Sequence, residues 1–156
     1  MVLKPARLTM LACLLSATFA LAHEGATGVV KERMDLMKRQ QDDMKLLGDM
    51  AKGKTSFDAV KAAEAARDVS LTAKKIHELF PEGSAGHPSD ALPSIWKEWD
   101  RFAGNATSLE SAADELASSI DGNAAQDWKA GFQKLTDACK SCHQDFRAKK
   151  KESEHH

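Results

Sequence analysis

The sequence predicts an all-α protein, an antiparallel four-helix bundle. Three observations support this fold class. The composition favours helix, since Ala, Lys, Glu, Leu and Met are abundant and Tyr is absent. Apolar residues recur at helical spacing in four stretches. Segments rich in Gly and Pro separate these stretches by two short connections and one long one, which suits helices packed side by side.

The N-terminal segment, residues 1–22, is predicted to be a signal peptide. Lys4 and Arg7 precede an apolar run that ends in a small-x-small pattern at Ala22, where signal peptidase would cut. The run is short for a membrane span and polar residues follow it. We therefore expect export to the periplasm, no membrane span after cleavage, and one domain over residues 23–156.

The first two helices are expected over residues 29–51 and 57–80, with Thr55 or Ser56 capping the second. A Lys-Gly-Lys turn separates them. The apolar stripe of the first helix contains Val30, Met34, Met37, Met44 and Leu47. That of the second contains Val60, Ala63, Ala66, Val69, Ala73, Ile76 and Phe80.

The last two helices are expected over residues 93–120 and 124–149, after a Pro- and Gly-rich loop at 81–93. An Asp-Gly-Asn turn separates them. The third stripe contains Ile95, Trp96, Trp99, Phe102, Ala106, Leu109, Ala113, Leu116 and Ile120. The fourth contains Trp128, Phe132, Leu135, Ala138, Cys139, Cys142 and Phe146.

The fourth stretch carries Cys139-Lys140-Ser141-Cys142-His143, the C-x-x-C-H attachment signature of c-type haem. On a helix, cysteines three residues apart reach one edge of a porphyrin and can add to its two vinyl groups. His143 points to the same side and can ligate the iron. The motif predicts one covalently bound haem c between the helices.

Three other interpretations of the two cysteines are weaker. A thioredoxin-type redox pair opens a helix after a strand, whereas this pair lies late in a helix. A zinc site needs two further ligands at metal spacing, and Cys13, the only other cysteine, leaves with the signal peptide. A disulfide between positions three residues apart in a helix would be strained.

The bulk charge argues against nucleic acid as a partner. The formal net charge is −1, so no global basic field exists to attract a polyanion. Nine aromatic residues without a single Tyr also make a platform for stacking bases unlikely to form.

The chain resembles the class II c-type cytochromes, the cytochrome c′ superfamily, over nearly all of its mature length. The resemblance lies in the position of C-x-x-C-H near the C-terminus and in flanking residues of three helices. These residues are Phe146-Arg147, Pro93-x-Ile95-Trp96 with Phe102, Ala51-Lys52-Gly53 and Phe57-Asp58. It implies a four-helix bundle with haem between the helices, and often a homodimer.

The resemblance also implies a distal position at Met37, within Leu36-Met37-Lys38. The low-spin branch of the superfamily has a ligand Met there, and the high-spin branch has a blocking apolar residue. We therefore expect His143 and Met37 as axial ligands, with Met34 as the substitute one turn away. The methionines could instead be core residues, and His77 or His87 is a further alternative for the sixth ligand.

The expected function is electron transfer with periplasmic redox partner proteins, without enzymatic activity. The alternative is a high-spin protein whose five-coordinate haem binds NO or CO. A peroxidase would need a distal acid/base and an Arg near the iron, and Arg33 is the only nearby charge that suits it. Arg147 is expected either to contact a haem propionate or to belong to a solvated basic tail.

Overall fold

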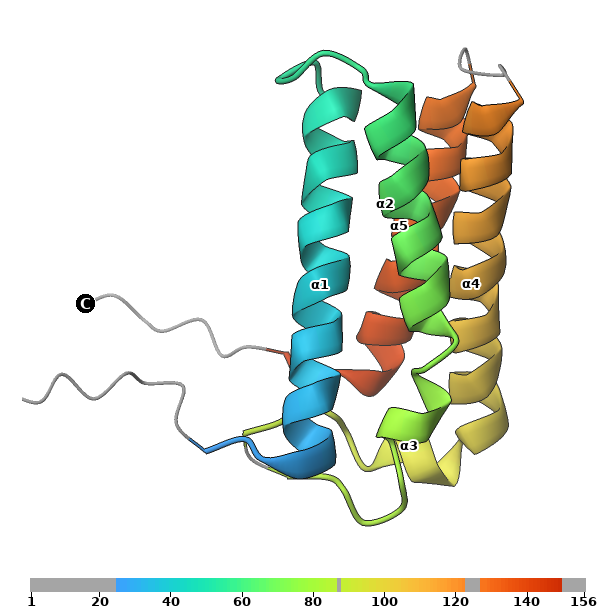
Figure 1. Ribbon diagram of the computed structural model, residues 1–156. Coiled ribbons are helices and arrows are strands. Elements are labelled where there is room, and N and C mark those ends of the chain that lie inside the picture. The colour runs from blue at the N-terminus through green and yellow to red at the C-terminus, as the bar shows by residue number, and fades with distance from the viewer. Residues whose placement is uncertain (1–24, 87, 123–126, 150–156) are drawn as a thin grey trace, which may run out of the picture.

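The computed structural model describes residues 25–86, 88–122 and 127–149, which form a four-helix bundle (Figure 1). The predicted signal peptide lies outside these residues. Two short helical pieces, a 3₁₀ helix and a single α turn, connect the second long helix to the third. The helices are α1 (Gly28–Ala51), α2 (Ala59–Ala73), η1 (His77–Leu79), α3 (Ser94–Lys97), α4 (Trp99–Asp121) and α5 (Trp128–Phe146).

Successive long helices run in opposite directions, so the predicted antiparallel topology is confirmed (Figure 1). The packing is uneven around the bundle. α4 packs extensively on both α2 and α5, and α1 packs on α2, whereas α5 touches α1 over only a short stretch. The α1–α5 side is therefore the least closed side of the core.

Within the described part of the chain, no helix has the length and apolarity needed to cross a membrane.

The buried face of α1 differs from the predicted stripe by about one residue. Its buried side chains are Arg33, Leu36, Gln40, Leu47 and Met50. Leu47 is buried as predicted, but Leu36 and Gln40 lie about 100° and about 60° from Met37 around the helix. Met37 and Met44 are consequently half-buried at the edge of the core, and Met34 is 41% exposed.

α2 begins later and ends earlier than predicted. Asp58 is its N-cap, and the carboxylate accepts a hydrogen bond of 3.1 Å from the backbone N–H of Lys61. The expected caps at Thr55 and Ser56 are therefore wrong. The α-helix ends at Ala73, and η1 continues the same direction. Val60, expected in the core, is 66% exposed because it lies on the face of the helix opposite to Ala62 and Val69, which are buried.

The predicted helix over residues 93–120 is interrupted at Glu98, whose φ of −124° and ψ of 43° are not helical. α3 is held against the preceding loop instead of lying in line with α4. The indole N–H of Trp96 donates to the carbonyl oxygens of Phe80 and Pro81, both at 3.0 Å. This side-chain contact is long-range in sequence, so helical periodicity did not reveal it.

α5 ends at Phe146, three residues earlier than expected; its expected start at 124 lies outside the described residues. Arg147 is extended and forms an isolated antiparallel β-bridge with Ala91. The N–H of Leu92 donates to the carbonyl of Phe146 at 3.0 Å, and the N–H of Ala148 donates to that of Asp90 at 2.8 Å. The 90–92 segment thus fastens the C-terminal end of α5.

Candidate functional site

The three residues of the predicted haem-attachment motif lie together on α5. Cys139, Cys142 and His143 are all half-buried, and both cysteines are free thiols packed against the edge of the core. Their spacing of three and four residues puts them on one side of the helix.

The two thiols are not activated for redox chemistry of the thioredoxin type. Burial raises the pKa of Cys139 to about 11. Burial, together with the charges of Cys139 and Asp145, raises the pKa of Cys142 to about 11. Reactive dithiols have a lowered pKa, usually at a helix N-terminus. The setting therefore argues against the thioredoxin alternative and agrees with thiols that end as thioethers.

His143 has the protonation state that an iron ligand requires. Burial lowers the pKa of its imidazole, and the positive charge of Arg147, four residues later, lowers it further. The ring is therefore neutral at physiological pH, with a nitrogen lone pair free to coordinate a metal.

A contact between α1 and α5 gives the register of the two helices. A Cβ placed on Gly48 would lie 3.6 Å from Cζ of Phe132. Met37 precedes Gly48 by 11 residues and His143 follows Phe132 by 11 residues. Eleven residues are about three turns and about 16 Å of helix, so in antiparallel helices the two residues lie at about the same level and on the facing sides.

The surroundings of Met37 and Met34 differ. Met37 is half-buried and packs against the core, whereas Met34 is 41% exposed. Neither side chain belongs to the fully buried part of α1. Met34 is therefore not a core residue, whereas Met37 packs at the edge of the core.

These side chains fit a haem. The donor set on the α1 and α5 sides comprises two protonated thiols, a neutral imidazole and a half-buried thioether. Thiols add to vinyl groups, and imidazole and thioether are both ligands of cytochrome iron. Apolar neighbours, including Ala138 and Phe132, suit the faces of a porphyrin.

The two arginines singled out from the sequence, Arg147 and Arg33, lie in different surroundings. The side chain of Arg147 is exposed at the end of α5, and its charge reaches His143. Arg33 is 3% exposed, and loop carbonyl and hydroxyl groups engage its guanidinium. It is therefore not free to act as the distal catalytic group of a peroxidase. Its helical spacing from Leu36 is the one sequence signal that could have indicated its burial.

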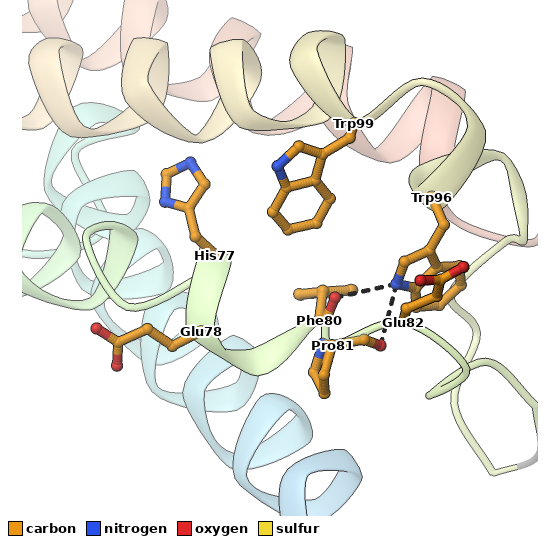
Figure 2. Close-up of a pocket in the computed structure, with 7 residues that line it drawn as sticks. All are labelled: His77, Glu78, Phe80, Pro81, Glu82, Trp96 and Trp99. Carbon is orange, nitrogen blue, oxygen red and sulfur yellow. Dashed lines mark hydrogen bonds between the residues drawn. The ribbon is translucent and has the colours of Figure 1, made fainter.

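A pocket of about 420 Å³ lies elsewhere, between η1 and the start of α4 (Figure 2). The ring of His77 points toward α4 in Figure 2, and its Nε2 lies 3.4 Å from the carbonyl of Ala103. The ring also packs edge-on against Trp99. This arrangement favours a packing role for His77 over iron ligation. The other histidine considered, His87, lies outside the described residues.

A pair of carboxylates on α1 and α2 is a feature that the sequence analysis missed. Oδ2 of Asp43 is buried without a hydrogen-bond partner among the described residues, and Asp68 forms an ion pair with Arg39. Burial, and then the neighbouring Asp68, raise the pKa of Asp43 to about 7. Only helix packing brings these two acids together, and no local sequence signal marks them.

Comparisons with known proteins agree with this geometry. The model of the family described as cytochrome c′ matches residues 28–147. The chain is 36% identical over 125 residues to cytochrome c-554 of Cereibacter sphaeroides, covering 78% of this chain and 81% of that protein. It is 33% identical over 137 residues to cytochrome c′ of Rhodopseudomonas palustris, covering 87% and 90% respectively.

Solved structures show the same fold. Cytochrome c′ from Rhodopseudomonas palustris aligns with a TM-score of 0.73 at 30% identity, covering 81% of this chain and 100% of that one. Cytochrome c prime from Shewanella frigidimarina aligns with a TM-score of 0.74 at 26% identity, covering 78% and 94%.

Proposed function

Because the chain belongs to the cytochrome c′ family and so carries covalently bound haem c, we propose that it is a periplasmic electron-transfer protein whose single low-spin haem is ligated by His143 and Met37. Its donors and acceptors are redox proteins of the same compartment. We further propose that the protein forms a homodimer, and sedimentation equilibrium tests this assembly.

The observation that carries this proposal is the register of α1 and α5. The contact between Gly48 and Phe132 puts Met37 level with His143, on facing sides of the least closed part of the bundle. A proximal imidazole on one helix and a thioether on the facing helix form a complete axial pair. Met34 supports the same role less well because its side chain is more exposed.

Each residue of the site has a separate role in holding the haem. The thiols of Cys139 and Cys142 would add across two vinyl groups, each S–H supplying the sulfur and the hydrogen, which leaves two thioether bonds. The neutral imidazole of His143 would donate its nitrogen lone pair, and Met37 would close the opposite position. When bound, haem supplies a one-electron iron couple.

Axial closure by Met37 explains why electron transfer is proposed over gas binding. A thioether in the sixth position leaves no open site for a diatomic ligand and raises the reduction potential. The alternative, a five-coordinate haem that binds NO or CO, requires that the Met37 thioether leave the sixth position of the iron open. The half-buried position of Met37 supports ligation, since the fully buried face of α1 lies at Leu36.

Visible spectroscopy tests the proposal. The protein is matured in a host that assembles c-type haem and is recorded oxidised, after dithionite, and after exposure to CO. We expect sharp, split low-spin bands on reduction that do not change with CO. A broad high-spin band that shifts with CO would establish the gas-binding alternative instead.

A further inference from the structure

Arg33 occupies an unusual place for a charged side chain. Among the described residues, it is the only charged one in the buried class, at 3% exposure. It lies on α1 four residues before Met37, which is one helical turn. Long charged side chains are rarely buried unless their charge is satisfied, so the contacts of this guanidinium must be accounted for.

The guanidinium is satisfied by the last residue of η1 and by the segment that follows it. Its Nε and Nη2 donate to the carbonyl of Leu79 at 3.0 and 2.8 Å. Nη1 donates to the carbonyl of Ser84 at 3.3 Å and to Oγ of Ser89 at 3.0 Å, and Nη2 donates to Oγ of Ser84 at 2.6 Å. The group also lies 4.0 Å from the centre of the Phe80 ring. These acceptors lie at three separate positions, Leu79, Ser84 and Ser89, so one side chain holds all three against α1.

The same segment continues directly to α5. Oγ of Ser89 also accepts a hydrogen bond of 3.2 Å from the N–H of Ala91. Ala91 pairs with Arg147 in the β-bridge, and the N–H of Leu92 donates to Phe146. Residues 89–92, held to Arg33 through Ser89, therefore form a strap that joins α1 one turn before Met37 to α5 one turn after His143.

We infer that Arg33 is a positioning residue: through this strap it sets the spacing between the helix turns that carry Met37 and His143, and so holds the thioether at the iron. The inference rests on the proposed function. Groups behind the first ligands commonly orient them, and their loss weakens ligation tenfold to a hundredfold. The planar fork of Arg is essential, because five bonds in fixed directions exceed what the point charge of Lys can make.

The test compares variants of the mature haem protein. Arg33→Lys keeps the charge and loses the fork, and Arg33→Met loses both. We expect both to raise the ratio of high-spin to low-spin ferric haem at least tenfold, and to let the reduced protein bind CO. The double variant Ser84→Ala/Ser89→Ala weakens the strap from its other side, and we expect a smaller change in the same direction.

Arg39→Lys and Arg39→Met are the matched controls, since Arg39 is exposed on the same helix and pairs with Asp68. We expect their spectra to stay like the wild type. Amide hydrogen exchange of Phe80, Ser84 and Ser89 is followed in every variant, and loss of the strap should accelerate it.

Each outcome either supports or refutes the positioning role of Arg33. If Arg33→Lys retains the wild-type spin ratio, the fork is not required and the inference fails, while the proposed function stands. If the wild-type protein is already high spin, the proposed function fails and the inference falls with it. Should the Arg33 variants not fold, the serine double variant carries the test alone, and an unchanged spectrum in it refutes the strap.

Discussion

Met37 and Met34 lie one turn apart on α1, and the proposed function makes Met37 the iron ligand. Met37 lies level with His143 and is half-buried, whereas Met34 is 41% exposed. We expect Met37→Ala to convert the haem to high spin and to open it to CO. Met34→Ala, the matched control, should leave both oxidised and reduced visible spectra unchanged. An unchanged spectrum in Met37→Ala would remove this residue from the ligand set.

Asp43 makes stability depend on pH. Its pKa is about 7 in the folded protein, raised mainly by burial and also by Asp68, against 3.8 for a free side chain. Between pH 4 and 7 the folded state therefore binds more proton than the unfolded state, so the free energy of unfolding falls as pH rises. Above pH 7 the ionised carboxylate destabilises the fold fully.

Asp43→Asn is expected to flatten this part of the pH profile. At pH 8 it should raise the free energy of unfolding by on the order of 1 kcal/mol, since the partial exposure of the site lets solvent screen the effect. Urea denaturation between pH 4 and 8 measures it. Asp42→Asn, at the exposed neighbouring position, should keep the wild-type slope; equal slopes in the wild type and Asp43→Asn would contradict the assignment.

At the scale of the elements, the start of α2 depends on one side chain. Asp58 caps the helix by accepting a hydrogen bond from Lys61, and the helix dipole favours its negative charge. We expect Asp58→Ala to lower the melting temperature by about 3–5 °C. Asp127 is the natural control, because it is the N-cap of α5 but its side chain makes no capping hydrogen bond. Differential scanning calorimetry of the two variants should show the larger loss for Asp58→Ala.

The helix boundaries show which element-level features were predictable. Periodicity correctly predicted α1 and the body of α4, since a long amphipathic helix repeats its signal many times. It failed at Glu98, because the indole of Trp96 holds α3 to carbonyls far away in sequence. Local patterns carry no information on such contacts.

At the scale of the whole molecule, we expect the stability of the bundle to depend on its haem. α5 packs well on α4 but only sparsely on α1, so a haem bound on that side would supply apolar packing that the helices lack. We expect the haem-free double variant Cys139→Ser/Cys142→Ser to melt at least about 10 °C below the haem protein. Far-UV circular dichroism measures the transition, and the absence of the haem absorption band verifies the loss.

Ser141→Ala is the control for this comparison, because Ser141 lies between the two cysteines and is exposed. It should keep both the haem and the melting temperature. We also expect amides of α1 to exchange faster in the haem-free protein, whereas those of α2 and α4 stay protected. Equal melting temperatures with and without haem would show that the helices close the α1–α5 side unaided.

The sequence by itself determined the fold class, the antiparallel order of the helices and the haem c, because these depend on repeated apolar spacing and on one contiguous motif at Cys139–His143. Tertiary structure alone decided the rest. It turned α1 so that Leu36 is buried and Met37 lies at the edge, it surrounded Arg33 with neutral acceptors, and it brought Asp43 to Asp68. The physical reason is that burial and partnership depend on what a neighbouring helix or loop presents, and those neighbours are distant in the chain.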